Sequence, residues 1–149
     1  MFLGHHPTQL KNSNRLSLPT GWRKRLTGGI YLTQGFDQNL LILTAETFQE
    51  IYERLSSLNI TDPLARLLLR MFLGTASYVE IKENEAISVP DSLMKYANLK
   101  GKVVLIGQGE YLEIWSPGHW AEQEAQIQDA QSNAARFSAF NIATRAQAA

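Results

Sequence analysis

Apolar and polar positions alternate strictly in two short segments, Leu16–Leu18 and Ile87–Val89. In both segments a serine separates two aliphatic residues, and a proline follows directly. Alternation of this kind is typical of a strand with one buried face. Proline ends such a strand because it has no N–H to donate to the ladder. We therefore predict two short strands, followed by a helix at residues 20–26 in the first case and at residues 91–97 in the second.

A pair of longer apolar segments follows each predicted helix. Residues 30–34 and 39–43 flank the turn Gly35-Phe36-Asp37, and residues 102–107 and 110–115 flank Gln108-Gly109. Short apolar segments separated by a turn that contains glycine predict β-hairpins. Each half of the chain is therefore expected to contain one short strand, one short helix and one hairpin.

The order of these segments is that of an internal repeat, whose offset drifts only between about 70 and 73 residues. The matched pairs are Phe2-Leu3-Gly4 with Phe72-Leu73-Gly74, Lys11 with Lys82, Arg15-Leu16-Ser17-Leu18-Pro19 with Ala86-Ile87-Ser88-Val89-Pro90, Tyr31-Leu32-Thr33 with Val104-Leu105-Ile106, less closely Leu41-Ile42-Leu43 with Glu113-Ile114-Trp115, and Phe48 with Trp120. A unit of roughly 45 residues is marginally stable alone. We therefore expect the two copies to pair with each other.

Two helices are predicted between the copies. Thr44 can cap a helix from Ala45 to about Leu58, in which four apolar residues share one stripe. These are Phe48, Ile51, Tyr52 and Leu55. Asp62-Pro63 is a strong start signal for a second helix, which we expect to run to Leu73 and to be stopped by Gly74.

The second of these helices is apolar on nearly every side, apart from Arg66 and Arg70. A helix of that kind must be buried on more than one side. We expect it to pack between the copies or against a neighbouring subunit, with the two arginines as a basic pair on its polar stripe.

These patterns predict a β-rich α+β protein with four parts. They are repeat 1 at residues 1–48, a helical linker at 49–71, repeat 2 at 72–122 and an Ala/Gln-rich tail at 123–149. The tail is expected to hold a helix to about Ala135 and then to fray, and no function is assigned to it.

Composition narrows the classes of protein that remain. Apolar residues make up 44% of the chain and charged residues 19%, which is enough to form a core. The absence of cysteine excludes disulfides, thiolate nucleophiles and cysteine-based zinc sites. No signal-peptide pattern opens the chain, and the apolar segment Leu64–Leu73 is too short to span a bilayer. A soluble cytoplasmic protein without membrane contact is therefore expected.

Charge is distributed unevenly, although the formal net charge is zero. Residues 1–36 contain five bases and no acid, and all 14 acids lie from Asp37 onward. A basic region on a neutral chain is the pattern expected of a phosphate-contacting surface. From charge alone, a solvated face whose acidic partners lie nearby in the fold is an equally open alternative.

No pattern for catalysis, a cofactor or a metal site is found. The side chains of His5 and His6 diverge in an extended strand and have no carboxylate within ten residues, and His119 is expected to be structural. Neither standard glycine-rich phosphate loop occurs, and no serine or threonine stands beside a histidine base. We therefore expect a protein that is not an enzyme.

The segment from Lys11 to Pro19 has the composition of a DNA contact. Lys11 and Arg15 bracket an Asn-Ser-Asn turn that leads into a predicted strand. Arginine pairs with guanine edges, asparagine pairs with adenine edges, and a β-hairpin or loop can carry both into a groove. We expect Arg15 to read a base edge and the other cations to bind mainly phosphates. The candidate DNA-binding residues are Lys11, Asn12, Asn14, Arg15, Arg23, Lys24 and Arg25.

The chain resembles the MraZ family over about residues 1–124. The resemblance rests on Met1-Phe2-Leu3-Gly4, Arg15-Leu16-Ser17-Leu18-Pro19, Leu69-Arg70-Met71-Phe72-Leu73-Gly74, Val103-Val104-Leu105-Ile106-Gly107 and Glu113-Ile114-Trp115. It implies two tandem SpoVT–AbrB-type units with swapped hairpins, which form a small double-ψ-like β-barrel. It also implies a cytoplasmic, nucleoid-associated bacterial regulator that forms ring-shaped homo-oligomers. Such a regulator binds direct repeats in double-stranded DNA upstream of its own division and cell-wall gene cluster, for repression.

The chain departs from the family pattern of an Asp, three residues and then an Arg. Lys11 and Lys82 stand at the Asp positions, and Ala86 replaces the second Arg. A carboxylate beside a phosphate-binding surface is repulsive, so Glu85 weakens copy two as a DNA reader. We expect copy one to carry the DNA contacts and copy two to be mainly structural. The alternative is an oligomeric protein-interaction module that has lost DNA binding.

Overall fold

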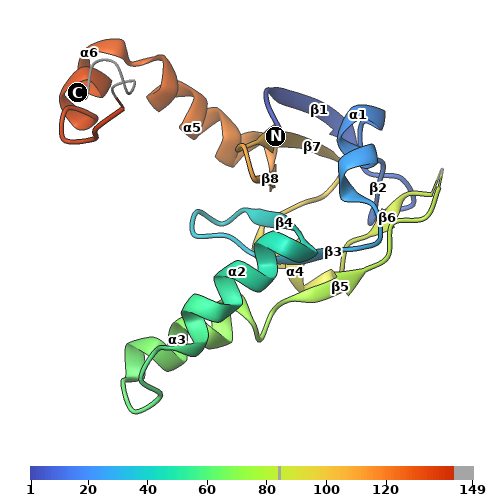
Figure 1. Ribbon diagram of the computed structural model, residues 1–149. Helices are drawn as coiled ribbons and strands as arrows, with labels where there is room; N and C mark the ends of the chain where they lie inside the picture. The colour runs from blue at the N-terminus through green and yellow to red at the C-terminus, as the bar shows by residue number, and fades with distance from the viewer. Residues whose placement is uncertain (84, 143–149) are drawn as a thin grey trace. The chain divides into compact units, whose positions relative to one another are not determined.

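The computed structural model of the chain describes residues 1–83 and 85–142 and divides into two compact units. The first unit comprises residues 1–117 and contains predicted repeat 1 and all but the last five residues of predicted repeat 2, and the second comprises residues 118–149 (Figure 1). The four-part division expected from the sequence stays a prediction.

A six-stranded antiparallel sheet forms the frame of the first unit. In spatial order its strands are β1 (His5–Gln9), β7 (Lys102–Gly107), β8 (Tyr111–Trp115), β4 (Leu40–Thr44), β3 (Ile30–Gln34) and β5 (Ser77–Val79). Two shorter strands, β2 (Arg15–Leu16) and β6 (Ile87–Ser88), pair with each other in a separate sheet.

The two repeats exchange strands throughout the first unit. Strand β1 of repeat 1 pairs with β7 of repeat 2, with His5 opposite Ile106. Strand β5 of repeat 2 pairs with β3 of repeat 1, with Val79 opposite Ile30. Hairpins β3–β4 and β7–β8 meet at the β4–β8 ladder. Neither repeat forms its sheet alone, so the copies pair as the sequence predicts.

The α+β class is confirmed, but the expected closed barrel is not. Strands β1 and β5 lie at the two edges of an open six-stranded sheet, and the β2–β6 pair is not part of it. The strands exchanged between the repeats are the single strands β1 and β5, and the swapped hairpins stay a prediction.

Strand β4 shows why the hairpins are so apolar. Leu40 and Ile42 lie in the larger core cluster, which also contains residues of α4 (Asp91–Tyr96). Leu41 and Leu43 lie in a second cluster, which packs under the helices between the repeats. Because successive side chains of a strand point to opposite faces, both faces of β4 are buried and the strand is a continuous apolar run.

The predicted strand and helix bounds are close to those observed. Strands β3 and β7 have the expected limits, whereas β4 and β8 each begin one residue later than expected. The helix expected at residues 20–26 is α1 (Thr20–Arg23) continued by the 3-10 turn η1 (Lys24–Leu26). That difference is common at helix ends, where hydrogen bonding often tightens to the 3-10 pattern.

The two linker helices begin at the predicted caps. Helix α2 (Ala45–Ser56) begins after Thr44, whose hydroxyl accepts a hydrogen bond from the Thr47 backbone N–H at 3.1 Å. Helix α3 (Pro63–Phe72) begins after Asp62, whose carboxylate accepts from the Leu64 N–H at 2.9 Å. On the predicted apolar stripe of α2, Tyr52 is an exception, because its side chain is 42% exposed.

Helix α3 is covered on one side within the chain. Its Phe72 and Ala65 are buried, whereas Leu64 and Leu67 are 73% and 61% exposed. Burial of the side that carries Leu64 and Leu67 stays a prediction. The helix ends before Gly74 as expected. Glycine is required at this position, because a Cβ there would lie 2.5 Å from the carbonyl oxygen of Arg70.

The second unit is helical. The prediction of a single tail helix to about Ala135 is wrong. The structure has two helices, α5 (Pro117–Gln128) and α6 (Ala130–Arg136), which are divided at Asp129. The Asp129 carboxylate accepts a hydrogen bond from the Ser132 N–H at 3.2 Å and so caps the new helix. The last part of the predicted tail, residues 143–149, lies outside the described residues. Within the described part of the chain, no helix is both long and apolar enough to cross a bilayer.

Candidate nucleic-acid interface

The turn that precedes β2 is closed by its own backbone. Lys11 and Arg15 exchange both N–H···O hydrogen bonds, at 2.8 and 2.9 Å. The loop between them contains Asn12 and Ser13 at φ 49° and 75°, in the left-handed region that asparagine tolerates well. The turn therefore holds Lys11 and Asn12 at the surface, where both are exposed.

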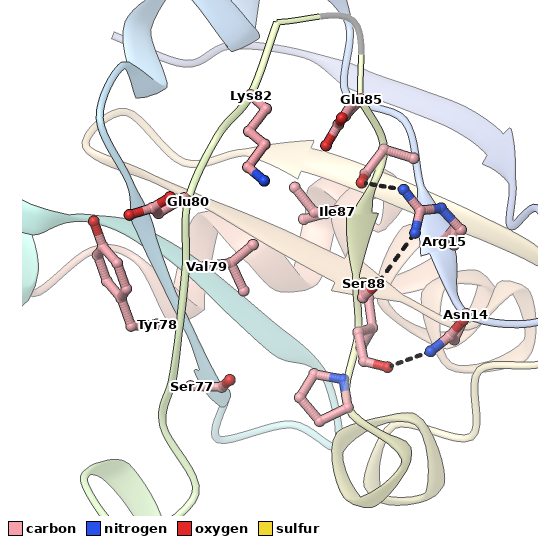
Figure 2. Close-up of a pocket in the computed structure, with 13 residues that line it drawn as sticks. Asn14, Arg15, Ser77, Tyr78, Val79, Glu80, Lys82, Glu85, Ile87 and Ser88 are labelled. Atoms are coloured by element: carbon pink, nitrogen blue, oxygen red, sulfur yellow. Dashed lines mark hydrogen bonds between the residues drawn. The ribbon is translucent and has the colours of Figure 1, made fainter.

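The next two candidates, Asn14 and Arg15, reach across to repeat 2 (Figure 2). The Asn14 side-chain amide donates to the carbonyl of Val89 at 3.3 Å. The Arg15 guanidinium donates to the carbonyl of Ala86 at 3.0 Å and to the hydroxyl of Ser88 at 3.5 Å. These bonds flank the short β2–β6 ladder, so both side chains tie the repeats together. Since a guanidinium has five N–H donors, three of those on Arg15 have no partner among the residues that the structure describes.

The cations that follow Pro19 have three different environments. Arg23 donates from one nitrogen, Nη2, to the backbone carbonyls of Lys82 and Glu85. Arg25 donates to the carbonyl of Met1 at 3.1 Å, and its guanidinium carbon lies 5.2 Å from the centroid of the Phe2 ring. Lys24 is exposed, and among the described residues its side chain has no hydrogen-bond partner.

Carboxylates of repeat 2 share the hollows that these cations line. A hollow of about 520 Å³ between β5 and β6 is lined by Arg15, Glu80 and Glu85, among others (Figure 2). A neighbouring hollow of about 390 Å³ is lined by Lys24 and Glu83, among others. The acid-free stretch of the sequence is therefore not acid-free in space. Its acidic neighbours come from the segment opposite, as the second interpretation of the charge pattern anticipated.

A buried carboxylate in the central strand β8 was not predicted from the sequence. Glu113 is 7% exposed and accepts three hydrogen bonds. Its Oε2 accepts from the amide of Asn39 at 2.8 Å, and its Oε1 accepts from Gln108 at 3.0 Å and from the indole of Trp115 at 3.1 Å. The sequence held one signal, a glutamate in a strand where repeat 1 has Leu41.

Tyr111 lies near this carboxylate. Burial raises the pKa of the Tyr111 hydroxyl above its usual range, and the negative charges of Glu113 and Asp37 raise it further. All three effects favour the neutral form of the tyrosine.

The arrangement provides hydrogen-bond donors for an anion. Lys11, Asn12, Arg15 and Lys24 offer ammonium, amide and guanidinium N–H groups at or near the surface. In the residues that the structure describes, no three His, Asp or Glu side chains gather where a metal ion could be held. His5 and His6 lie in strand β1.

Comparison with known proteins matches the repeat that the sequence and fold display. A family model described as "MraZ protein, putative antitoxin-like" matches twice in tandem, at residues 1–71 and 71–142. The transcriptional regulator MraZ of Thermomicrobium roseum is 37% identical over 123 residues, which cover 83% of this chain and 87% of that protein. Those of Herpetosiphon aurantiacus and Clostridium tetani are 34% and 32% identical, and each match covers 95% of this chain and 100% of the relative. With two tandem matches and relatives covered nearly end to end, the chain belongs to the MraZ family.

Proposed function

We propose that the chain is a DNA-binding transcriptional regulator. The observation that carries the proposal is the closed turn from Lys11 to Arg15, which holds cationic and amide donors together at the surface. Such donors bind phosphate oxygens, and arginine and asparagine also pair with base edges. The name transcriptional regulator, carried by the relatives in this family, supports the same function.

Within this surface the residues divide by how firmly they are held. Arg15 is half-buried and anchored by two hydrogen bonds, so it loses little freedom when it binds and suits a base edge. Lys11 and Lys24 are exposed and flexible, and suit phosphates, which fix the register without reading sequence. Asn12 is exposed on the turn and is the second candidate for base recognition, whereas the amide of Asn14 already donates to repeat 2.

Membership of the family extends the proposal to its biology. The chain acts in the cytoplasm, associated with the nucleoid, as a repressor of a bacterial division and cell-wall gene cluster. It binds direct repeats upstream of that cluster as a ring of identical subunits. The exposed Leu64 and Leu67 on α3 support self-association, since a neighbouring subunit would cover them. A contact between two different patches closes into a ring when its rotation permits.

Gel-shift titrations test DNA binding directly. The full chain is titrated with the promoter DNA upstream of its own gene and with random DNA of equal length, over a salt series. The expected result is tighter binding to the promoter, with log affinity falling linearly with log salt. Equal and weak binding to both DNAs would refute a sequence-specific regulator.

The expected division of roles is tested with Arg15→Ala and Lys24→Ala. Lys24→Ala should weaken binding to both DNAs and reduce the salt slope by about 0.9, the value for one phosphate contact. Arg15→Ala should lower the preference for the promoter over random DNA. If Arg15→Ala weakens both DNAs equally, Arg15 binds phosphate and specificity comes from elsewhere.

A second candidate function has a specific observation in its favour. Glu80, Glu83 and Glu85 share hollows with the cations of repeat 1, and this mixed charge suits a protein partner better than DNA. The chain would then be an oligomeric interaction module without DNA binding. Unchanged mobility with both DNAs, together with a stable oligomer in light scattering, would favour it over the regulator.

A further inference from the structure

The corresponding turns of the two repeats are closed in different ways. In repeat 1, Lys11 and Arg15 exchange two backbone hydrogen bonds. In repeat 2 their counterparts are Lys82 and Ala86, and among the described residues the backbone bond at this place is a single one, from the Glu85 N–H to the Lys82 carbonyl at 3.3 Å. Its length is beyond the usual range for an N–H···O bond, so this bond holds the Lys82 and Glu85 backbones together only weakly.

Arg23 provides two further hydrogen bonds to this backbone. Its Nη2 donates to the carbonyls of Lys82 and Glu85, which are the two ends of that weak backbone bond. The position that corresponds to Arg23 in repeat 2 is Met94, which has no N–H in its side chain. The arginine of repeat 1 therefore fixes backbone of repeat 2, and repeat 2 has no equivalent arginine to fix repeat 1.

The held segment carries carboxylates next to the proposed DNA surface. Glu83 lines a hollow with Lys24, and Glu85 lines a hollow with Arg15. Where the Lys82 and Glu85 backbones lie therefore decides how close two negative charges come to a bound phosphate. Like charges brought together in that way would weaken binding.

We propose that Arg23 is a positioning residue, which acts on DNA binding by fixing the Lys82 and Glu85 backbones, and is not itself a phosphate contact. This replaces the role that its charge suggested in the sequence. The inference rests on the proposed function, but its structural half can be tested without DNA. When Arg23 fixes this backbone, the carboxylates of Glu83 and Glu85 stay in their hollows. When Arg23 is removed, the two carboxylates approach the phosphates of bound DNA.

Arg23→Ala and Lys24→Ala form a matched pair, since the residues are adjacent cations. In hydrogen exchange on the full chain without DNA, Arg23→Ala should speed exchange of the Glu85 amide about tenfold, because its hydrogen bond to the Lys82 carbonyl is no longer supported. Lys24→Ala should leave that amide unchanged. Unchanged exchange in Arg23→Ala would overturn the proposal, even if the wild-type chain proves not to bind DNA.

Promoter binding over a salt series then separates positioning from contact. Arg23→Ala should weaken binding about three- to tenfold and leave the salt slope unchanged, whereas Lys24→Ala should lower the slope by about 0.9. Adding Glu83→Gln and Glu85→Gln to Arg23→Ala should restore wild-type affinity. The two Gln changes alone should strengthen binding by the wild-type chain, but less than they strengthen binding by Arg23→Ala, and the difference measures the coupling. A slope reduced by about 0.9 in Arg23→Ala that the Gln changes do not restore would make Arg23 a phosphate contact and overturn the proposal.

Discussion

Replacing Glu113 by glutamine should destabilise the fold although the two side chains have nearly the same shape. The Oε2 atom of Glu113 accepts from the Asn39 amide, and its Oε1 accepts from Gln108 and Trp115. A glutamine has only one oxygen, so its NH₂ group must face a donor on one side or the other. The Asn39 amide cannot simply rotate, because its Oδ1 accepts from the Asp37 N–H at 3.2 Å.

The magnitude follows from how deeply these groups are buried. Asn39 is 0% exposed and Glu113 is 7% exposed, so water cannot replace the lost bond. A buried polar group left without its partner costs about 1–3 kcal/mol, and a bond to a charged acceptor is at the upper end of this range. We expect Glu113→Gln to lower the free energy of unfolding by about 3 kcal/mol. For a chain of this length that corresponds to a fall in Tm of about 6–12 °C.

Urea denaturation at one fixed protein concentration measures this change. A fixed concentration is needed because self-association would add to the apparent stability. Gln108→Ala is the matched control, since Gln108 is exposed and its loss leaves Glu113 two donors, so it should cost less than about 1 kcal/mol. The reasoning is refuted if Glu113→Gln lies within about 1 kcal/mol of wild type, or if Gln108→Ala is equally destabilising.

Three further outcomes are expected. Gly107→Ala should lower the free energy of unfolding by about 2–4 kcal/mol in the same assay, because its Cβ would lie 2.5 Å from the carbonyl carbon of Phe2 and backbone cannot yield as a side chain does; wild-type stability would refute this. In promoter gel shifts, Arg15→Ala should weaken binding far more than Lys82→Ala, because carboxylates surround Lys82; equal losses would contradict the asymmetry. Burial, and then nearby carboxylates, raise the pKa of Tyr111, so the unfolded chain loses this proton first as pH rises above about 10. Stability should therefore fall through that range and fall less in Tyr111→Phe, as pH-dependent denaturation would reveal.

Local features of the fold were predictable because each depends on neighbouring residues. The Asp62-Pro63 start of α3 and the bounds of β3 follow from capping and apolar runs, and the structure has both. The break at Asp129 was missed, since the Ala- and Gln-rich sequence around it favours an unbroken helix.

The candidate site was predictable only in part, because its partners are distant in sequence. The Asn-Ser-Asn turn identified Lys11 and Arg15 as neighbours, and the structure closes that turn between them. No local pattern indicates that Arg23 reaches the carbonyls of Lys82 and Glu85, since that contact exists only once β2 has paired with β6. The same pairing brings carboxylates beside a region that the linear sequence shows as purely basic.

The exchanged strands also constrain how the chain matures during synthesis. Strand β1 is made before its partner, because the residues opposite it in β7 follow roughly 100 residues later in the chain. At a typical rate of translation, β1 waits about 5–20 s for its partner. A strand that waits is a hazard for aggregation when it is apolar, and this one is His-His-Pro-Thr-Gln. Its proline and polar side chains suit a nascent segment that must stay unpaired until almost the whole of the first unit has left the ribosome.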